Sequence, residues 1–253
     1  MPRSTFRNLP EAKRARIAEA AIEEFAERGY GGASISAIVA RAGIAKGSFY
    51  QYFENKADLF RWLVMDHTVQ LKMRYISART TPEIGDFWSQ IADMMLAGIR
   101  FGLDNPRLSR MAAILWHPTA DPELAALLNE FQALTRRSMG LLLQQGQATG
   151  HVRTDLDLEV AGDFMVAQLM QGLDLAIQRR IGTDLISFCA QPELADRFRE
   201  RDQRHVIAAL IDLLRRALGT PKPPIRMADE PLIDLERLVD EAREPPKGGG
   251  SAR

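Results

Sequence analysis

The sequence predicts an all-α protein with a small N-terminal domain of three helices, including a helix-turn-helix, and a larger C-terminal helical domain. Three observations predict this class. The chain has 253 residues, of which 46% are hydrophobic, so it can bury a substantial core. Apolar residues recur at spacings of three and four, and no stretch of useful length alternates like a strand. Helix-start signals, in which a capping residue precedes proline, recur at residues 81–82, 105–106 and 121–122.

The chain begins with a basic stretch, and we expect residues 1–9 to form a flexible arm. Residues 1–16 hold five basic side chains and one acidic side chain, a local balance of +4. Such an arm can follow phosphates or enter a minor groove, although a solvated, disordered terminus is an equal alternative. A first helix is predicted over residues 10–28, with Ile17, Ala21 and Phe25 on its apolar side and Gly29 at its end.

Residues 35–53 carry the pattern of two short helices joined by a tight turn. Ile35, Ile38 and Val39 share one helix face. Ser34 precedes them as a natural N-cap, because its hydroxyl can accept an unpaired backbone N–H. Gly43 suits the left-handed position that ends a helix, and the second helix opens at Ala45.

The second helix of this pair has a core side and an outer side. Phe49 and Phe53 are four residues apart, so both rings turn toward the core. The opposite side presents Lys46, Tyr50 and Gln51, an arrangement that a DNA major groove accepts. Lysine can reach phosphate or guanine, glutamine can pair with an adenine edge, and tyrosine can meet a thymine methyl group. The alternative is a solvated helix face without a partner.

The run AGIAKGSFYQYFENKADLF, within residues 42–60, resembles the helix-turn-helix of the TetR/AcrR family of transcriptional regulators. The resemblance implies a DNA-binding domain over residues 10–56. In this family the positions matching Tyr52, Lys56 and Ser34 contact phosphates. The predicted DNA-binding residues are Ser34, Ala45, Lys46, Gly47, Ser48, Tyr50, Gln51, Tyr52 and Lys56. Arg41 is either a phosphate contact or a surface charge.

The second domain is predicted over residues 57–219. Asn55 caps a long helix that reaches about Ser77 and links the two domains. Further helices are expected near 82–103, 106–116, 122–148, 155–180 and 193–218, with a loop at 182–191. Residues 220–253 form a tail rich in proline and glycine, in which 230–243 are predicted to dock as a short helix.

The resemblance also implies a small-molecule effector among the helices of the second domain and a homodimer built by the helices at 155–180 and 193–218. Bulky and soft side chains can outline an apolar cavity, although ordinary core packing is the better explanation for each of them taken singly. The candidate pocket residues are Trp88, Met95, Phe101, Met111, Trp116, Met139, Phe164 and Met170. The apolar residues of the last two helices fit either a dimer interface or a core within one protomer.

Composition and motifs argue against several other classes of protein. The 33 basic and 33 acidic residues balance, so any DNA binding depends on local charge. A single cysteine excludes an internal disulfide and fits the cytoplasm, and no signal peptide or membrane span is expected, because polar residues interrupt the apolar stretch at 160–177. The four histidines lack metal-ligand spacing, and no catalytic motif is present, so we expect neither an enzyme nor a cofactor or metal site.

The resemblance implies a repressor that binds a palindromic DNA operator as a dimer and leaves it when an effector binds. The alternative is an all-α small-molecule-binding or interaction protein that keeps the fold without specific DNA binding.

Overall fold

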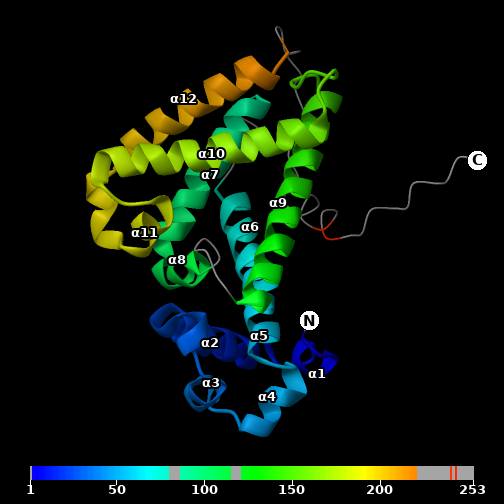
Figure 1. The fold of residues 1–253 in the computed structure, drawn as a ribbon, viewed down its shortest axis with the longest axis vertical. Helices are drawn as coiled ribbons and strands as arrows, with labels where there is room; N and C mark the ends of the chain where they lie inside the picture. The colour runs from blue at the N-terminus through cyan, green and yellow to red at the C-terminus, as the bar shows by residue number, and fades with distance from the viewer. Residues whose placement is uncertain (1, 80–85, 115–120, 221–239, 241–242, 244–253) are drawn as a thin grey trace, which may run out of the picture. The chain divides into compact units, whose positions relative to one another are not determined.

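The computed structural model describes residues 2–79, 86–114, 121–220, 240 and 243, and in this part the regular structure is helical (Figure 1). The only β feature in the described ranges is an isolated bridge between Val152 and Gly219. The all-α prediction is therefore confirmed. The residues fall into two compact units. One comprises Met1–Tyr75, Gly98–Asn129 and Ile177–Phe198, and the other comprises Ile76–Ala97, Glu130–Ala176 and Arg199–Arg253.

The N-terminal stretch is a docked helix, which corrects the expectation of a flexible arm over residues 1–9. Helix α1 (Ser4–Arg7) places Phe6 in a fully enclosed site, only 1% exposed. The Phe6 ring lies 4.7 Å from the rings of both Phe53 and Trp62, measured between centroids. Phe6, the one aromatic side chain in this basic stretch, thus fixes the terminus, because its burial removes a large aromatic surface from water.

Helix α2 (Glu11–Gly32) is the longest helix of the N-terminal region. Gly29 has non-helical backbone angles, φ 65° and ψ 176°, so the regular helix is interrupted at the glycine predicted to end it, and one more helical turn follows to Gly32. Ile17, Ala21 and Phe25 are fully buried, as the apolar pattern predicts.

The long helix predicted after Asn55 is present as one uninterrupted helical run. It consists of α5 (Lys56–Trp62), a π-helical segment (Leu63–Thr68) and α6 (Val69–Ser77), with helical backbone angles at both junctions. The Asn55 side chain accepts the Asp58 N–H at 2.8 Å, which confirms the predicted cap.

Two of the three proline start signals, at residues 105–106 and 121–122, are confirmed by the middle helices. Helix α7 spans Phe87–Asp104, α8 spans Pro106–Ala113 and α9 spans Pro122–Ala148. The bounds of α9 match the prediction, whereas residues 80–85, at the expected start of the preceding long helix, lie outside the described part.

The last helices differ from the prediction in their starting residues and in one additional helix. Helix α10 (Leu158–Ile181) is followed by α11 (Leu185–Ala190), where a loop was expected. The Asp184 side chain accepts the Ser187 N–H at 2.8 Å and so starts α11. Pro192 then opens a 3₁₀ turn (Pro192–Arg197), and helix α12 (Glu200–Leu218) begins later than the predicted residue 193. The predicted tail helix at 230–243 lies outside the described residues apart from positions 240 and 243.

Candidate DNA-binding surface

Two short helices and a glycine turn form the helix-turn-helix. Helix α3 spans Ile35–Ala42 and α4 spans Lys46–Tyr52. The Ser34 hydroxyl accepts the Ala37 N–H, and Gly43 adopts a left-handed conformation with φ 65° and ψ 41°. A side chain at Gly43 would meet backbone strain, so glycine is needed for the chain to leave α3 at this angle. Both predicted signals are confirmed.

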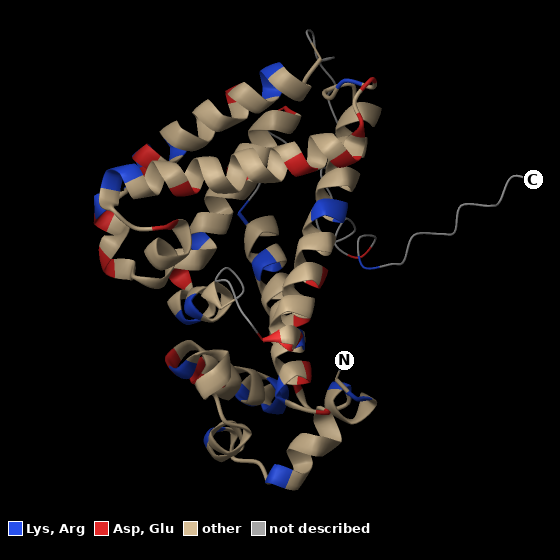
Figure 2. Cartoon of the chain, viewed as in Figure 1, with Lys and Arg blue, Asp and Glu red and all other residues tan. Residues whose placement is uncertain are grey.

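Helix α4 divides into the expected core side and outer side. Phe49 and Phe53 are fully buried, with ring centroids 5.7 Å apart. On the outer side Lys46 and Gln51 are exposed, and Tyr50 keeps 44% of its surface exposed even though it is aromatic. Figure 2 shows a basic but no acidic residue on α4. This side can therefore approach a polyanion without meeting a carboxylate of its own helix.

The remaining predicted residues on α4 and its turn are small and accessible. Ala45 is the N-cap residue and has no side-chain hydrogen bond, Gly47 has no atom within 4 Å of the place where a Cβ would lie, and Ser48 is half-exposed. Open space at Gly47 leaves room for a phosphate backbone to come close.

Ser36, which the sequence patterns missed, lies beside this surface. Its hydroxyl accepts a hydrogen bond from the Lys46 ammonium at 3.3 Å, so the starts of α3 and α4 are joined through exposed polar groups. Ser36 could have been found from its position two residues after the N-cap Ser34, since the backbone N–H groups of a first helical turn have no partner within the helix.

Tyr52 and Lys56 lie deeper than the other predicted residues. The Tyr52 ring is buried, and its centroid lies 5.7 Å from the Lys13 ammonium. The Lys56 ammonium donates to the backbone carbonyls of Tyr30 at 2.6 Å and Ala33 at 3.1 Å. Lys56 therefore ties the end of α2 to the start of α5, and two of its three protons are already used.

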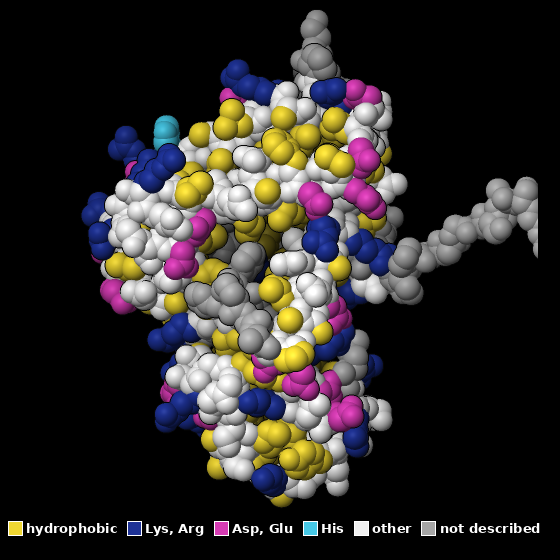
Figure 3. Space-filling view, viewed as in Figure 1, with side chains coloured by type: hydrophobic (Ala, Val, Ile, Leu, Met, Phe, Trp, Pro, Cys, Tyr) yellow, Lys and Arg dark blue, Asp and Glu magenta, His cyan; other side chains and the backbone are white. Residues whose placement is uncertain are grey.

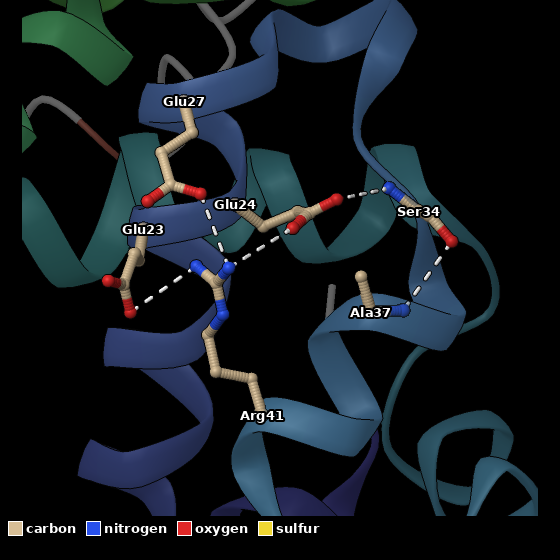
Figure 4. A network of polar contacts seen from close by, with 6 residues as sticks. All are labelled: Glu23, Glu24, Glu27, Ser34, Ala37 and Arg41. Atoms are coloured by element: carbon tan, nitrogen blue, oxygen red, sulfur yellow. Dashed lines mark hydrogen bonds and ion pairs between the residues drawn. The ribbon is translucent and has the colours of Figure 1, made fainter.

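Arg41 faces the protein instead of extending away from it. Its guanidinium lies 3.3 Å from the Glu23 carboxylate, 3.2 Å from Glu27 and 3.8 Å from Glu24, all on α2 (Figure 4). The hydrogen bond with Glu27 is the main cause of its raised pKa. The guanidinium is thus occupied by three carboxylates and forms part of the contact between α2 and α3.

Comparison with known proteins agrees with this geometry. Residues 17–63 match the family model described as bacterial regulatory proteins, tetR family. The chain is 28% identical over 152 residues to the probable acrEF/envCD operon repressor of Escherichia coli K12, covering 58% of this chain and 68% of that protein. A TetR family transcriptional regulator from Chloroflexus aurantiacus has 28% identity and a TM-score of 0.55, covering 87% of this chain and 99% of that one.

The chain belongs to the TetR/AcrR family of transcriptional regulators. It is a DNA-binding regulator, and α3 and α4 are its helix-turn-helix. A further structure of the same fold is that of FadR from Bacillus subtilis in complex with stearoyl-CoA, with 20% identity, a TM-score of 0.54, and coverage of 78% of this chain and 97% of that one.

The predicted pocket residues of this regulator occupy several environments. Trp88, Phe101 and Met111 are buried, and Met95, Met139 and Met170 are half-buried. Phe164 is 41% exposed on α10, and Trp116 lies outside the described residues. Their role as ligand contacts stays a prediction.

Lys72 and Cys189 are two polar side chains near Gly98 and Gly102 of α7. A Cβ on Gly98 would lie 3.8 Å from the Lys72 ammonium, and one on Gly102 would lie 2.8 Å from the Cys189 sulfur. Desolvation raises the pKa of the Cys189 thiol to about 12. Cys189 therefore stays protonated at neutral pH and is not an activated nucleophile.

Within the described residues, no group of three His, Cys, Asp or Glu side chains is placed to hold a metal ion. None of the helices in the described ranges is long and apolar enough to cross a membrane.

Proposed function

We propose that this regulator is a repressor that binds a palindromic operator as a homodimer and is released by a small-molecule effector. The observation that carries the DNA-binding part is the outer side of α4, where Lys46, Tyr50 and Gln51 are exposed on a helix whose other side is buried. An exposed aromatic ring beside a lysine and an amide matches the contacts that base edges and phosphates offer in a major groove.

We assign the other predicted residues to the DNA backbone. The Ser34 oxygen accepts the Ala37 N–H, which leaves the Ser34 hydroxyl proton free to donate to a phosphate at the start of α3. Ala45, Gly47 and Ser48 allow the backbone of the second helix to approach. We infer that Tyr52 and Lys56 contribute through a hydroxyl and a remaining ammonium proton, because most of each side chain is engaged within the protein.

An exposed apolar stripe on α10 supports the proposed dimer. Val160 is 67% exposed, Phe164 41% and Leu175 49%, and Leu213 on α12 is 63% exposed. Figure 3 shows hydrophobic side chains gathered over α10. Large apolar side chains left in water on two neighbouring helices are typical of a protein interface. The alternative role, a core within one protomer, fits other residues of these helices, since Leu169, Leu173 and Ile211 are buried.

We propose that the effector is a small organic molecule bound among the helices that follow α5. An effector changes operator binding only if it binds the two shapes of the dimer with different affinity. The uninterrupted helical run of residues 56–77 begins directly after the helix-turn-helix, so a displacement along it would reach α4. A regulator of this kind acts where the DNA is, and we therefore expect it in the cytoplasm.

Selection of bound sequences from a random duplex pool tests the proposal. We expect a palindromic motif with half-sites about one helical turn apart. Lys46→Ala and Tyr50→Ala should each weaken binding to that motif at least tenfold, whereas Gln132→Ala, an exposed change on α9, should not. The affinity should fall steeply with salt, by about 0.9 log units per phosphate contact for each log unit of salt. A folded protein that enriches no sequence would favour the alternative of a binding protein without specific DNA recognition.

A further inference from the structure

Glu24 is an acidic side chain inside the protein. It keeps 4% of its surface exposed and is the one buried carboxylate in the described ranges. Burial of an unpaired carboxylate is costly, so its position needs partners that offset the lost hydration.

Both oxygens of Glu24 face α3. One accepts the backbone N–H of Ser34 at 3.1 Å, and the other lies 3.8 Å from the Arg41 guanidinium (Figure 4). Ser34 is the N-cap of α3, and Arg41 lies in its last turn. One carboxylate of α2 therefore contacts residues from both ends of α3.

The ion pairs of Arg41 with Glu23 and Glu27 contribute less to the position of α3. Glu23 is partly exposed and Glu27 exposed, and exposed ion pairs contribute little because water and salt screen them. The Glu24 carboxylate is shielded from water. It also accepts the backbone N–H of Ser34, the residue whose hydroxyl we propose to contact a phosphate. The orientation of α3 relative to α2 thus depends mainly on Glu24 among these three acids.

We propose that Glu24 is a positioning residue for operator binding, which holds the start of α3 so that the Ser34 hydroxyl meets a DNA phosphate. This inference rests on the proposed DNA-binding function. Glu24 does not touch DNA in this arrangement, since its carboxylate is buried between α2 and α3. It acts through Ser34, whose backbone it fixes while the Ser34 hydroxyl stays available.

The test compares Glu24→Gln and Glu24→Leu with Glu19→Gln, a charge-matched control on the same helix. Glu19 is exposed and forms no hydrogen bond or ion pair among the described residues. Operator affinity is measured by fluorescence anisotropy on the selected duplex at a temperature where each variant is fully folded. Glu24→Leu should weaken binding about tenfold, the size of one hydrogen bond to a charged group. Glu24→Gln should lose less, because its amide oxygen can still accept the Ser34 N–H, and Glu19→Gln should bind as the natural protein does.

A double-mutant cycle with Ser34→Ala separates positioning from general stability. If Glu24 acts through Ser34, Glu24→Leu should cost much less in the Ser34→Ala background than alone. The salt dependence should stay the same in all variants, because neither side chain releases a counterion. Equal losses in both backgrounds, or Glu24 variants that bind as tightly as the natural protein, would overturn the inference. Failure of the natural protein itself to bind any duplex would instead count against the proposed function.

Discussion

Replacing Phe6 by alanine tests whether α1 is part of the folded N-terminal region. The ring is 1% exposed, and its centroid lies 4.7 Å from Phe53 and Trp62 and 5.9 Å from Tyr52. Truncation of a buried phenylalanine costs about 3–5 kcal/mol. We expect a loss near the lower end, about 3 kcal/mol, because a four-residue terminal helix can adjust more than a central one.

This loss has a measurable size in thermal unfolding. For a chain of this length 1 kcal/mol corresponds to about 2–4 °C, so the melting temperature should fall by about 6–12 °C. Circular dichroism at 222 nm follows the transition. Operator affinity should fall as well, because the backbone N–H of Arg3 donates to the Tyr52 carbonyl at 2.9 Å, and the hydroxyl of Thr5 donates to the Gln51 carbonyl, both at the end of α4.

Ser4→Ala is the matched control, since Ser4 is exposed on the same helix. It should leave the melting temperature within about 1–2 °C of the natural value, as surface changes usually cost under about 0.5 kcal/mol. A fall of less than about 2 °C in Phe6→Ala would refute the docked helix and restore the flexible arm that the basic sequence predicts.

Four further predictions concern other parts of the chain. Gly146→Ala would place a Cβ 2.5 Å from a Val152 methyl carbon and should lower stability by about 1–3 kcal/mol, whereas Gly140→Ala on the same helix meets no atom within 4 Å and should raise stability by about 0.5–1 kcal/mol; urea titration measures both. Desolvation, followed by the charge of a nearby arginine, lowers the pKa of His67 below its unfolded value of about 6.5. The contribution of His67 to the free energy of unfolding should therefore be fully present above pH 6.5 and be lost as the pH falls through the lowered pKa. In urea titrations repeated at several pH values, the stability of His67→Gln should decrease less over that range. Leu213→Glu should convert the dimer to monomers in sedimentation experiments, and an unchanged mass would exclude α12 from the interface. Tyr30→Phe should speed amide hydrogen exchange in the first turn of α9, and unchanged exchange would count against the contact described below.

The sequence predicted best those features that depend on neighbouring residues. Ser34, Gly43 and Asn55 act as the caps that their residue types favour, because capping needs only a backbone group three residues away or a left-handed turn. The same holds for α9, whose proline start and glycine-containing end lie within one segment. The two sides of α4 also follow from helical spacing alone.

Features that depend on distant partners could not be predicted in this way. Phe6 is buried by rings more than 45 positions later in the chain, and no local pattern distinguishes it from a solvated residue. From the sequence alone, Glu24 is only one of several acidic residues on α2, and Lys56 is a basic residue expected to contact a phosphate. Their contacts with Ser34 and Tyr30 become visible only when the helices are packed. Helix α11 was missed for another reason, because its six residues are too few to show a helical period.

Helix α2 connects the reading helices to the start of α9. Through Glu24 it holds α3, and through Tyr30 it meets α9, since the Tyr30 hydroxyl donates to the Glu123 carboxylate at 2.9 Å. Desolvation and this carboxylate raise the pKa of Tyr30, so the hydroxyl stays a donor throughout the physiological range. A hydrogen bond to a charged group is worth about 1.5–3 kcal/mol, somewhat less here because Glu123 is exposed. Coupling between an effector site and a DNA site is typically about 1–3 kcal/mol. The free energy of this one contact is therefore of the same size as such a coupling.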